Sequence, residues 1–117
     1  MIFAVVYSPG PAWIEGKSIE DQPLENHVQY LMQLYRRRVL LMGGPFLDDA
    51  GGLVVIEAQT VAEAERFIRD DPANAVGTLT ARLHPWHIAF ARNLWRRLRG
   101  RPSCDRIAED DGASSAI

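Results

Sequence analysis

The chain has 117 residues, a hydrophobic content of 47% and a formal net charge of −2 at pH 7. This length suits one domain, and the apolar content is too high for a disordered chain. A net charge this small does not favour nucleic acid or a membrane surface as a partner. Cys104 is the single cysteine, so no internal disulfide can form, which fits a reducing compartment. Residues 1–7 are too short for a signal peptide or a membrane span, and we expect a cytoplasmic protein.

The first third of the chain predicts a strand followed by a helix. Residues 2–7 are almost wholly apolar and rich in β-branched and aromatic side chains, which predicts a strand buried on both faces. A polar connection over residues 8–22 follows. Pro23 suits the first turn of a helix over residues 24–38. One apolar face is predicted from spacings of four, three and four residues, and it comprises Leu24, Val28, Leu31 and Tyr35.

The middle of the chain predicts a hairpin, a second helix and a fourth strand. Apolar runs at residues 39–42 and 53–56 are separated by the break Gly43-Gly44-Pro45 and by turn-forming residues 48–52, so these two strands should pair. Thr60 and Glu63 form a capping box that begins a helix over residues 61–70, whose buried face should contain Val61, Ala64, Phe67 and Ile68. Residues 79–86 alternate in polarity and predict the last strand.

The resulting order, βαββαβ, predicts an α+β domain of the ferredoxin-like class. Right-handed crossovers should place both helices on one face of the sheet. The first three strands are too apolar for their other face to meet water, so we expect a second copy of the chain to cover it as a homodimer.

The chain changes character after the last predicted strand. Phe90, Leu94 and Leu98 lie on one stripe among arginines, which predicts a basic amphipathic helix over residues 88–99. We assign residues 1–99 to the domain and expect residues 100–117 to be a flexible tail. Because the helix lacks interleaved aromatic platforms, it does not favour nucleic-acid binding.

Residues spread over positions 1–87 resemble the YciI-like (YCII-related) family. The matching positions are His27 with Tyr30-Leu31, Gly44-Pro45, Ala64, Asp71-Pro72 with Gly77, and Pro85-Trp86. The resemblance implies a dimeric α+β barrel of ferredoxin-like subunits, a His–Asp active site and, in some members, lyase or dehydrohalogenase chemistry. On this resemblance, His27 and Asp71 are the catalytic pair. Leu24 and Ala73 depart from the family pattern, which often has an arginine and an aromatic residue there.

His27 and Asp71 each have a structural interpretation beside the catalytic one. His27 could be a half-buried core histidine, although its place early in a helix favours the neutral imidazole that a general base requires. Asp71 precedes Pro72 and is well placed as the N-cap of a helical turn over residues 72–76, a role that contributes about 1 kcal/mol. Capping and orienting His27 are compatible, because a carboxylate has two oxygens.

The predicted function is a small enzyme that uses His27 as general base and Asp71 as its orienting partner on a small organic substrate, by elimination (lyase) or isomerisation. The candidate substrate-binding residues are Tyr7, Gly44, Pro45 and Trp86. We expect no cofactor. We also expect no metal, since Pro85 breaks the continuous helix that would bring His84 and His87 together as ligands. The alternatives are a non-catalytic small-molecule-binding or regulatory module and an assembly protein whose basic helix docks a partner.

Overall fold

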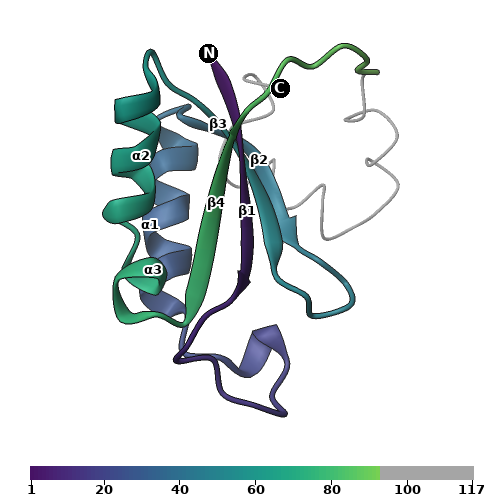
Figure 1. The fold of residues 1–117 in the computed structure, drawn as a ribbon, viewed down its shortest axis with the longest axis vertical. Helices are drawn as coiled ribbons and strands as arrows, with labels where there is room; N and C mark the ends of the chain where they lie inside the picture. Colours follow the sequence, from purple (N-terminus) through teal and green to yellow (C-terminus); the bar gives the residue numbers. More distant parts are fainter. Residues whose placement is uncertain (93–117) are drawn as a thin grey trace. The chain divides into compact units, whose positions relative to one another are not determined.

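Four antiparallel strands form one sheet in the order β2-β3-β1-β4 (Figure 1). The computed structural model describes residues 1–92, and residues 1–86 make up the unit that contains every helix and strand of the described part. The elements in chain order are β1 Ile2–Pro9, η1 Ile19–Asp21, α1 Glu25–Arg36, β2 Leu40–Pro45, β3 Gly52–Glu57, α2 Val61–Arg69, α3 Pro72–Val76 and β4 Leu79–Pro85. The predicted α+β, ferredoxin-like fold is thereby confirmed.

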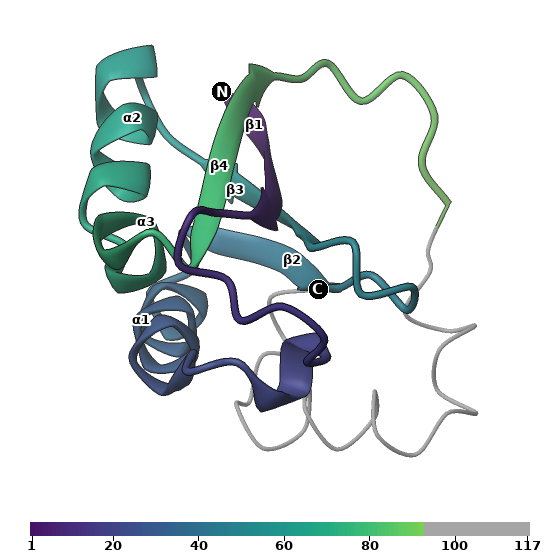
Figure 2. The same ribbon diagram turned by 60° about the horizontal axis from the view of Figure 1, so that its bottom comes forward.

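The α-helices lie together on one face of this sheet, as Figures 1 and 2 both show. This arrangement is the one that right-handed crossovers require of a split βαβ unit. It brings the beginning of α1 close to the segment that links α2 to α3, which decides where the candidate site lies.

β1 alternates between two environments. Phe3, Val5 and Tyr7 are buried on the helix side, whereas Ile2, Ala4 and Val6 are only partly buried. The predicted burial of this strand on both faces is therefore not complete within one chain, because the helices cover one face only.

The helices begin and end near their predicted bounds, and their predicted buried faces are correct except at one position in each. Val28 and Val61 are exposed, at 53% and 44%. His27 is the buried residue of α1 instead, and Tyr30, Leu31, Leu34 and Tyr35 pack partly against the core around it. Leu24, Leu31 and Tyr35 do pack in or against the core, as predicted. Apolar spacing failed at Val28 and missed His27, because it gave no weight to a histidine that has a buried polar partner.

Turns and strand ends also depart from the prediction. α1 ends at Arg36 rather than at residue 38, because Arg38 takes a left-handed conformation with φ of 65°. β2 continues through Gly43-Gly44-Pro45, where a break was predicted, and its pairing with β3 shifts between Leu40 and Met42. Such a bulge inserts one extra residue into the strand.

The predicted C-terminal helix is not seen over residues 88–92, which have no regular secondary structure. Pro85, Trp86 and His87 offer no side chain of the kind that favours a helix N-terminus at this point. Residues 93–99 of that helix and the predicted tail at 100–117 lie outside the described part of the chain.

Candidate functional site

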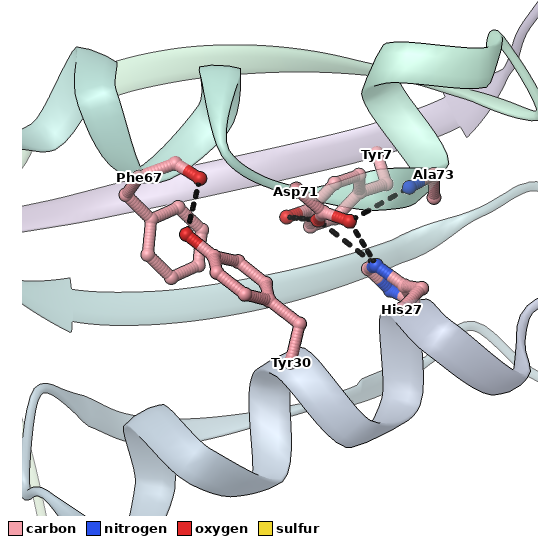
Figure 3. Close-up of polar contacts among 6 residues, drawn as sticks. All are labelled: Tyr7, His27, Tyr30, Phe67, Asp71 and Ala73. Carbon is pink, nitrogen blue, oxygen red and sulfur yellow. Dashed lines mark hydrogen bonds and ion pairs between the residues drawn. The ribbon is translucent and has the colours of Figure 1, made fainter.

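His27 and Asp71 meet in the structure, 44 positions apart in sequence. The imidazole Nδ1 of His27 lies 2.8 Å from Oδ1 and 2.9 Å from Oδ2 of the carboxylate (Figure 3). His27 is 8% exposed and Asp71 is fully buried. The third residue of α1 thus points directly at the segment between α2 and α3.

Asp71 is held at this position by the way the neighbouring helices end and begin. α2 ends with Asp70 at its C-cap, and Pro72 occupies the first turn of α3. Asp71 itself is extended, at φ −74° and ψ 120°, as expected for a residue before proline. Its Oδ1 accepts a 2.9 Å hydrogen bond from the backbone N–H of Ala73, which confirms the predicted N-cap.

Tyr7 provides a further hydrogen bond to the same carboxylate, one that sequence reasoning did not anticipate. Its hydroxyl donates to Oδ2 of Asp71 at 2.7 Å. The Tyr7 ring also meets the His27 ring edge-on, with centroids 5.2 Å apart. Burial raises the pKa of Tyr7 well above its usual range, and the charge of Asp71 and the hydrogen bond to it act in the same direction. The phenol therefore stays protonated and donates.

The hydrogen-bond pattern fixes which nitrogen of His27 carries the proton. An ionised carboxylate can only accept, so Nδ1–H donates to Asp71. In neutral imidazole the other nitrogen, Nε2, then has a free lone pair. Among the described residues no hydrogen bond engages Nε2. General-base catalysis by a histidine requires this arrangement of a neutral imidazole and an orienting carboxylate.

Tyr30 connects the site to α2. Its hydroxyl donates a 2.7 Å hydrogen bond to the carbonyl oxygen of Phe67, and the two rings pack against each other (Figure 3). Burial, with smaller contributions from the charges of Asp70 and Asp71, raises the pKa of Tyr30 to about 12. Asp70 is exposed, so it does not compete with Asp71 for His27.

A mainly apolar cavity of about 560 Å³ opens beside His27. This volume is typical of a site for a small organic molecule. Three of the predicted substrate-binding residues, Tyr7, Gly44 and Pro45, line the cavity together with His27. Its other walls come from η1, α1 and the strands, and they are Ile19, Glu20, Gln22, Leu24, Glu25, Val28, Gln29, Leu31, Gly52, Leu53, Val54 and Leu79. Asp71 lies behind His27 and does not line the cavity.

Trp86 is the predicted substrate-binding residue that the fold does not bring to this cavity. It follows the end of β4, and its backbone N–H donates to the carbonyl oxygen of Ile2. Tyr7 lies five residues further along β1, about 17 Å away at strand spacing. The prediction that Trp86 binds substrate therefore finds no support within one chain.

The loop between β1 and α1 supplies a cavity wall that the sequence did not reveal. Gln22 is 4% exposed, and its side chain accepts from the N–H of Ile14 and donates to the carbonyl oxygens of Ile14 and Lys17, at 2.9–3.2 Å. The N–H of Ile19 donates to Asp49 in the β2–β3 turn at 3.2 Å. These contacts give the loop a defined shape, but they follow no periodic pattern that would predict it.

The fold and this buried His–Asp pair define a small α+β domain with a cavity beside an imidazole. The model of the YCII-related domain family matches residues 1–86, and the chain belongs to that family. A similar protein is the uncharacterized YjpA of Bacillus subtilis (strain 168), which is 31% identical over 72 residues, or 62% of this chain and 85% of YjpA. The resemblance inferred from sequence is therefore confirmed.

A solved structure shares the fold. It is that of 5-chloro-2-hydroxyhydroquinone dehydrochlorinase (TftG) from Burkholderia phenoliruptrix AC1100 in complex with 2,5-dihydroxybenzoquinone. The match has a TM-score of 0.55 and 22% identity, and it covers 74% of this chain and 94% of the other.

Metal clusters and membrane-spanning helices are both lacking in the described part of the chain. Over residues 1–92, no group of three or more His, Cys, Asp and Glu side chains is arranged to hold a metal ion. Within the same range, no helix has the length and apolar character needed to span a membrane.

Proposed function

We propose that this protein is a small enzyme in which His27 acts as a general base on a small organic substrate in the cavity. The observation that carries the proposal is the hydrogen bond from Nδ1–H of His27 to Asp71, which leaves Nε2 as the basic nitrogen of a residue that lines the cavity. Tyr7 and Asp71 hold the imidazole, and Gly44 and Pro45 form part of the wall that a substrate would contact.

The proposed reaction begins when Nε2 takes a proton from the substrate, and His27 becomes an imidazolium paired with Asp71. The electron pair left on the substrate then expels a leaving group in an elimination, or shifts a double bond in an isomerisation. In both cases the imidazolium returns the proton to water or to product. The position of the carboxylate favours this step, because the positive charge forms next to Asp71.

The solved structural neighbour supports the elimination branch. It is named a dehydrochlorinase, and loss of hydrogen chloride requires a group that accepts the proton. We therefore include halogenated aromatic and ketone compounds among the first substrates to test.

Proton–deuterium exchange tests the proposal on a panel of compounds rather than on one chosen substrate. The protein is incubated in D₂O with small carbon acids, including chlorinated hydroquinones and ketones, and loss of the exchangeable proton signal is followed by NMR. We expect faster exchange for some members, and release of chloride where chlorine is present. His27→Gln should reduce exchange to background, because general-base assistance is typically worth roughly 100-fold or more.

His87→Gln is the matched control, because His87 is exposed and does not line the cavity. It should leave exchange unchanged. If compounds bind in the cavity but His27→Gln exchanges them as fast as the unmodified protein, the alternative of a non-catalytic binding module is the better description.

We also propose that the second face of the sheet is covered by another copy of the chain. Ile2, Ala4 and Val6 of β1 lie on that face, and Leu53 of β3 and Met42 of β2 are aligned with them by the strand register. Light scattering at low concentration should report a dimer. Val6→Lys should dissociate it, whereas Val76→Lys on exposed α3 should not. A monomeric unmodified protein would contradict this assembly.

A further inference from the structure

The cavity beside His27 has formal charges of one sign. Glu20 in η1 and Glu25 at the start of α1 line it, and both are exposed at its rim. No lysine or arginine is among the described residues that form its walls. Asp71 adds a further negative charge directly behind the imidazole, 2.8 Å from Nδ1. A bound molecule therefore meets carboxylates on two sides and no cation while His27 is neutral.

The rest of the lining offers little to a charged group. Most of the walls between the glutamates and His27 are apolar side chains and glycines, with Leu24, Leu31, Val54 and Leu79 among them, and the neutral amide of Gln29 also lines the cavity. Gln22 also lines the cavity, but its amide is already bonded to the backbone of its own loop. Burying a carboxylate or a phosphate between apolar walls and the two glutamates costs free energy, because few groups of this lining can replace its water.

The proposed proton transfer has the same charge requirement. When a neutral substrate gives its proton to Nε2, the new anion is formed beside the new imidazolium and the two attract each other. A substrate that is already anionic would become a dianion among three carboxylates, with one imidazolium to offset them. The charge of the site thus favours a substrate that enters uncharged.

We infer that the substrate of this cavity is a neutral, mainly apolar molecule with one acidic hydrogen, and that the cavity rejects carboxylates and other anions. This inference rests on the proposed function, since the acidic hydrogen has a role only if His27 is a base. The charge preference itself is a property of binding and is measured separately from catalysis.

Three probes with one ring and different charge test it: 4-hydroxybenzyl alcohol, 4-hydroxybenzylamine and 4-hydroxybenzoate, which at pH 7 are neutral, cationic and anionic. Dissociation constants come from amide chemical-shift titrations of the full chain. We expect the neutral and cationic probes to bind at least about tenfold more tightly than the anion, because the partly screened charges of Glu20 and Glu25 repel the anion. Raising the salt concentration should reduce the difference in affinity between the anionic probe and the other two.

The double variant Glu20→Gln/Glu25→Gln should bind the anionic probe more tightly and the neutral alcohol almost unchanged, which reduces the difference between their dissociation constants. Glu63→Gln/Glu65→Gln on exposed positions of α2 is the control of equal net charge, and it should keep the full difference. Equal binding of the three probes, or tighter binding of the anion, overturns the inference and leaves the proposed base intact. If the charge preference is found but exchange is as fast in His27→Gln as in the unmodified protein, the proposed function is contradicted instead. If none of the three probes binds, the inference is also overturned, while the exchange assay still decides the proposed function.

Discussion

The hydroxyl of Tyr7 donates a 2.7 Å hydrogen bond to Asp71 across 64 positions of sequence. Through that carboxylate, β1, α1 and α3 are joined at one buried point, because His27 and the N–H of Ala73 donate to the same side chain. Tyr7, which was predicted to contact substrate, thus also holds the carboxylate that orients His27, the proposed base.

Tyr7→Phe should loosen His27 without unfolding the protein. The substitution keeps the ring against His27 but removes one donor from a buried carboxylate, a loss of about 1–3 kcal/mol of stability. The Nδ1–H proton of His27 should give a slowly exchanging downfield NMR signal in the unmodified protein, and this signal should broaden in Tyr7→Phe. Tyr30→Phe, whose hydroxyl bonds to Phe67, is the control. An unchanged signal in Tyr7→Phe would show that the hydroxyl has no positioning role.

Asp71→Asn should separate the capping role of this residue from its role at His27. The amide oxygen can still accept from the N–H of Ala73, so α3 keeps its cap. The amide NH₂ then faces the donors of Tyr7 and His27, which favours the other imidazole tautomer and removes the lone pair from Nε2. We expect exchange activity to fall, but less severely than in His27→Ala.

Asp71→Ala removes the cap as well, and it should cost more stability than Asp71→Asn in urea unfolding. Asp70→Asn, one position away and exposed, should change neither the stability in urea nor the exchange activity. Full activity in Asp71→Asn would mean that the carboxylate does not set the tautomer.

Two glycines on either side of the β2–β3 turn should respond oppositely to alanine. A Cβ at Gly44 would meet no atom within 4 Å, and Gly44 lines the cavity. Gly44→Ala should therefore keep the melting temperature. A Cβ at Gly51, where φ is 134°, would overlap the carbonyl oxygen of Tyr7, so Gly51→Ala should lose about 3 kcal/mol or more. A large loss of melting temperature in Gly44→Ala would contradict the open space beside this glycine.

Alkaline pH should destabilise the fold through its buried phenols. The pKa of Tyr30 rises from 10.0 to about 12 on folding, mainly because of burial. The folded chain then holds its proton more tightly than the unfolded chain, so this contribution is complete below pH 10 and is lost as the pH rises toward 12. Urea unfolding at pH 8 and pH 11 should show the loss, and Tyr30→Phe should show less of it. The same loss in both proteins would mean that Tyr30 is not responsible.

The fold followed from sequence because its signals are local. The capping box at Thr60, the apolar run of β1 and the glycine-rich turn each act within a few residues, and together they specify the strand and helix order. The side chain of Thr60 does accept from the N–H of Glu63, as the capping box predicts.

The geometry of the candidate site could not be predicted from local patterns, because it depends on contacts between distant segments. Periodicity assigned Val28 to the buried face of α1, and the helix instead turns His27 inward, toward a carboxylate on another helix. The family resemblance paired His27 with Asp71, but the part played by Tyr7 at the carboxylate and the loop held by Gln22 depend on pairs of polar atoms that only the folded chain brings together.

Asp71 caps α3 and also fixes the imidazole, so folding alone is enough to preserve it. A relative without the aspartate would lose this helix cap and leave the Tyr7 hydroxyl without an acceptor, whether or not it is an enzyme. His27 is under no such constraint from α3. If His27 is the base, as we propose, relatives without activity should therefore lose the histidine and still keep the aspartate.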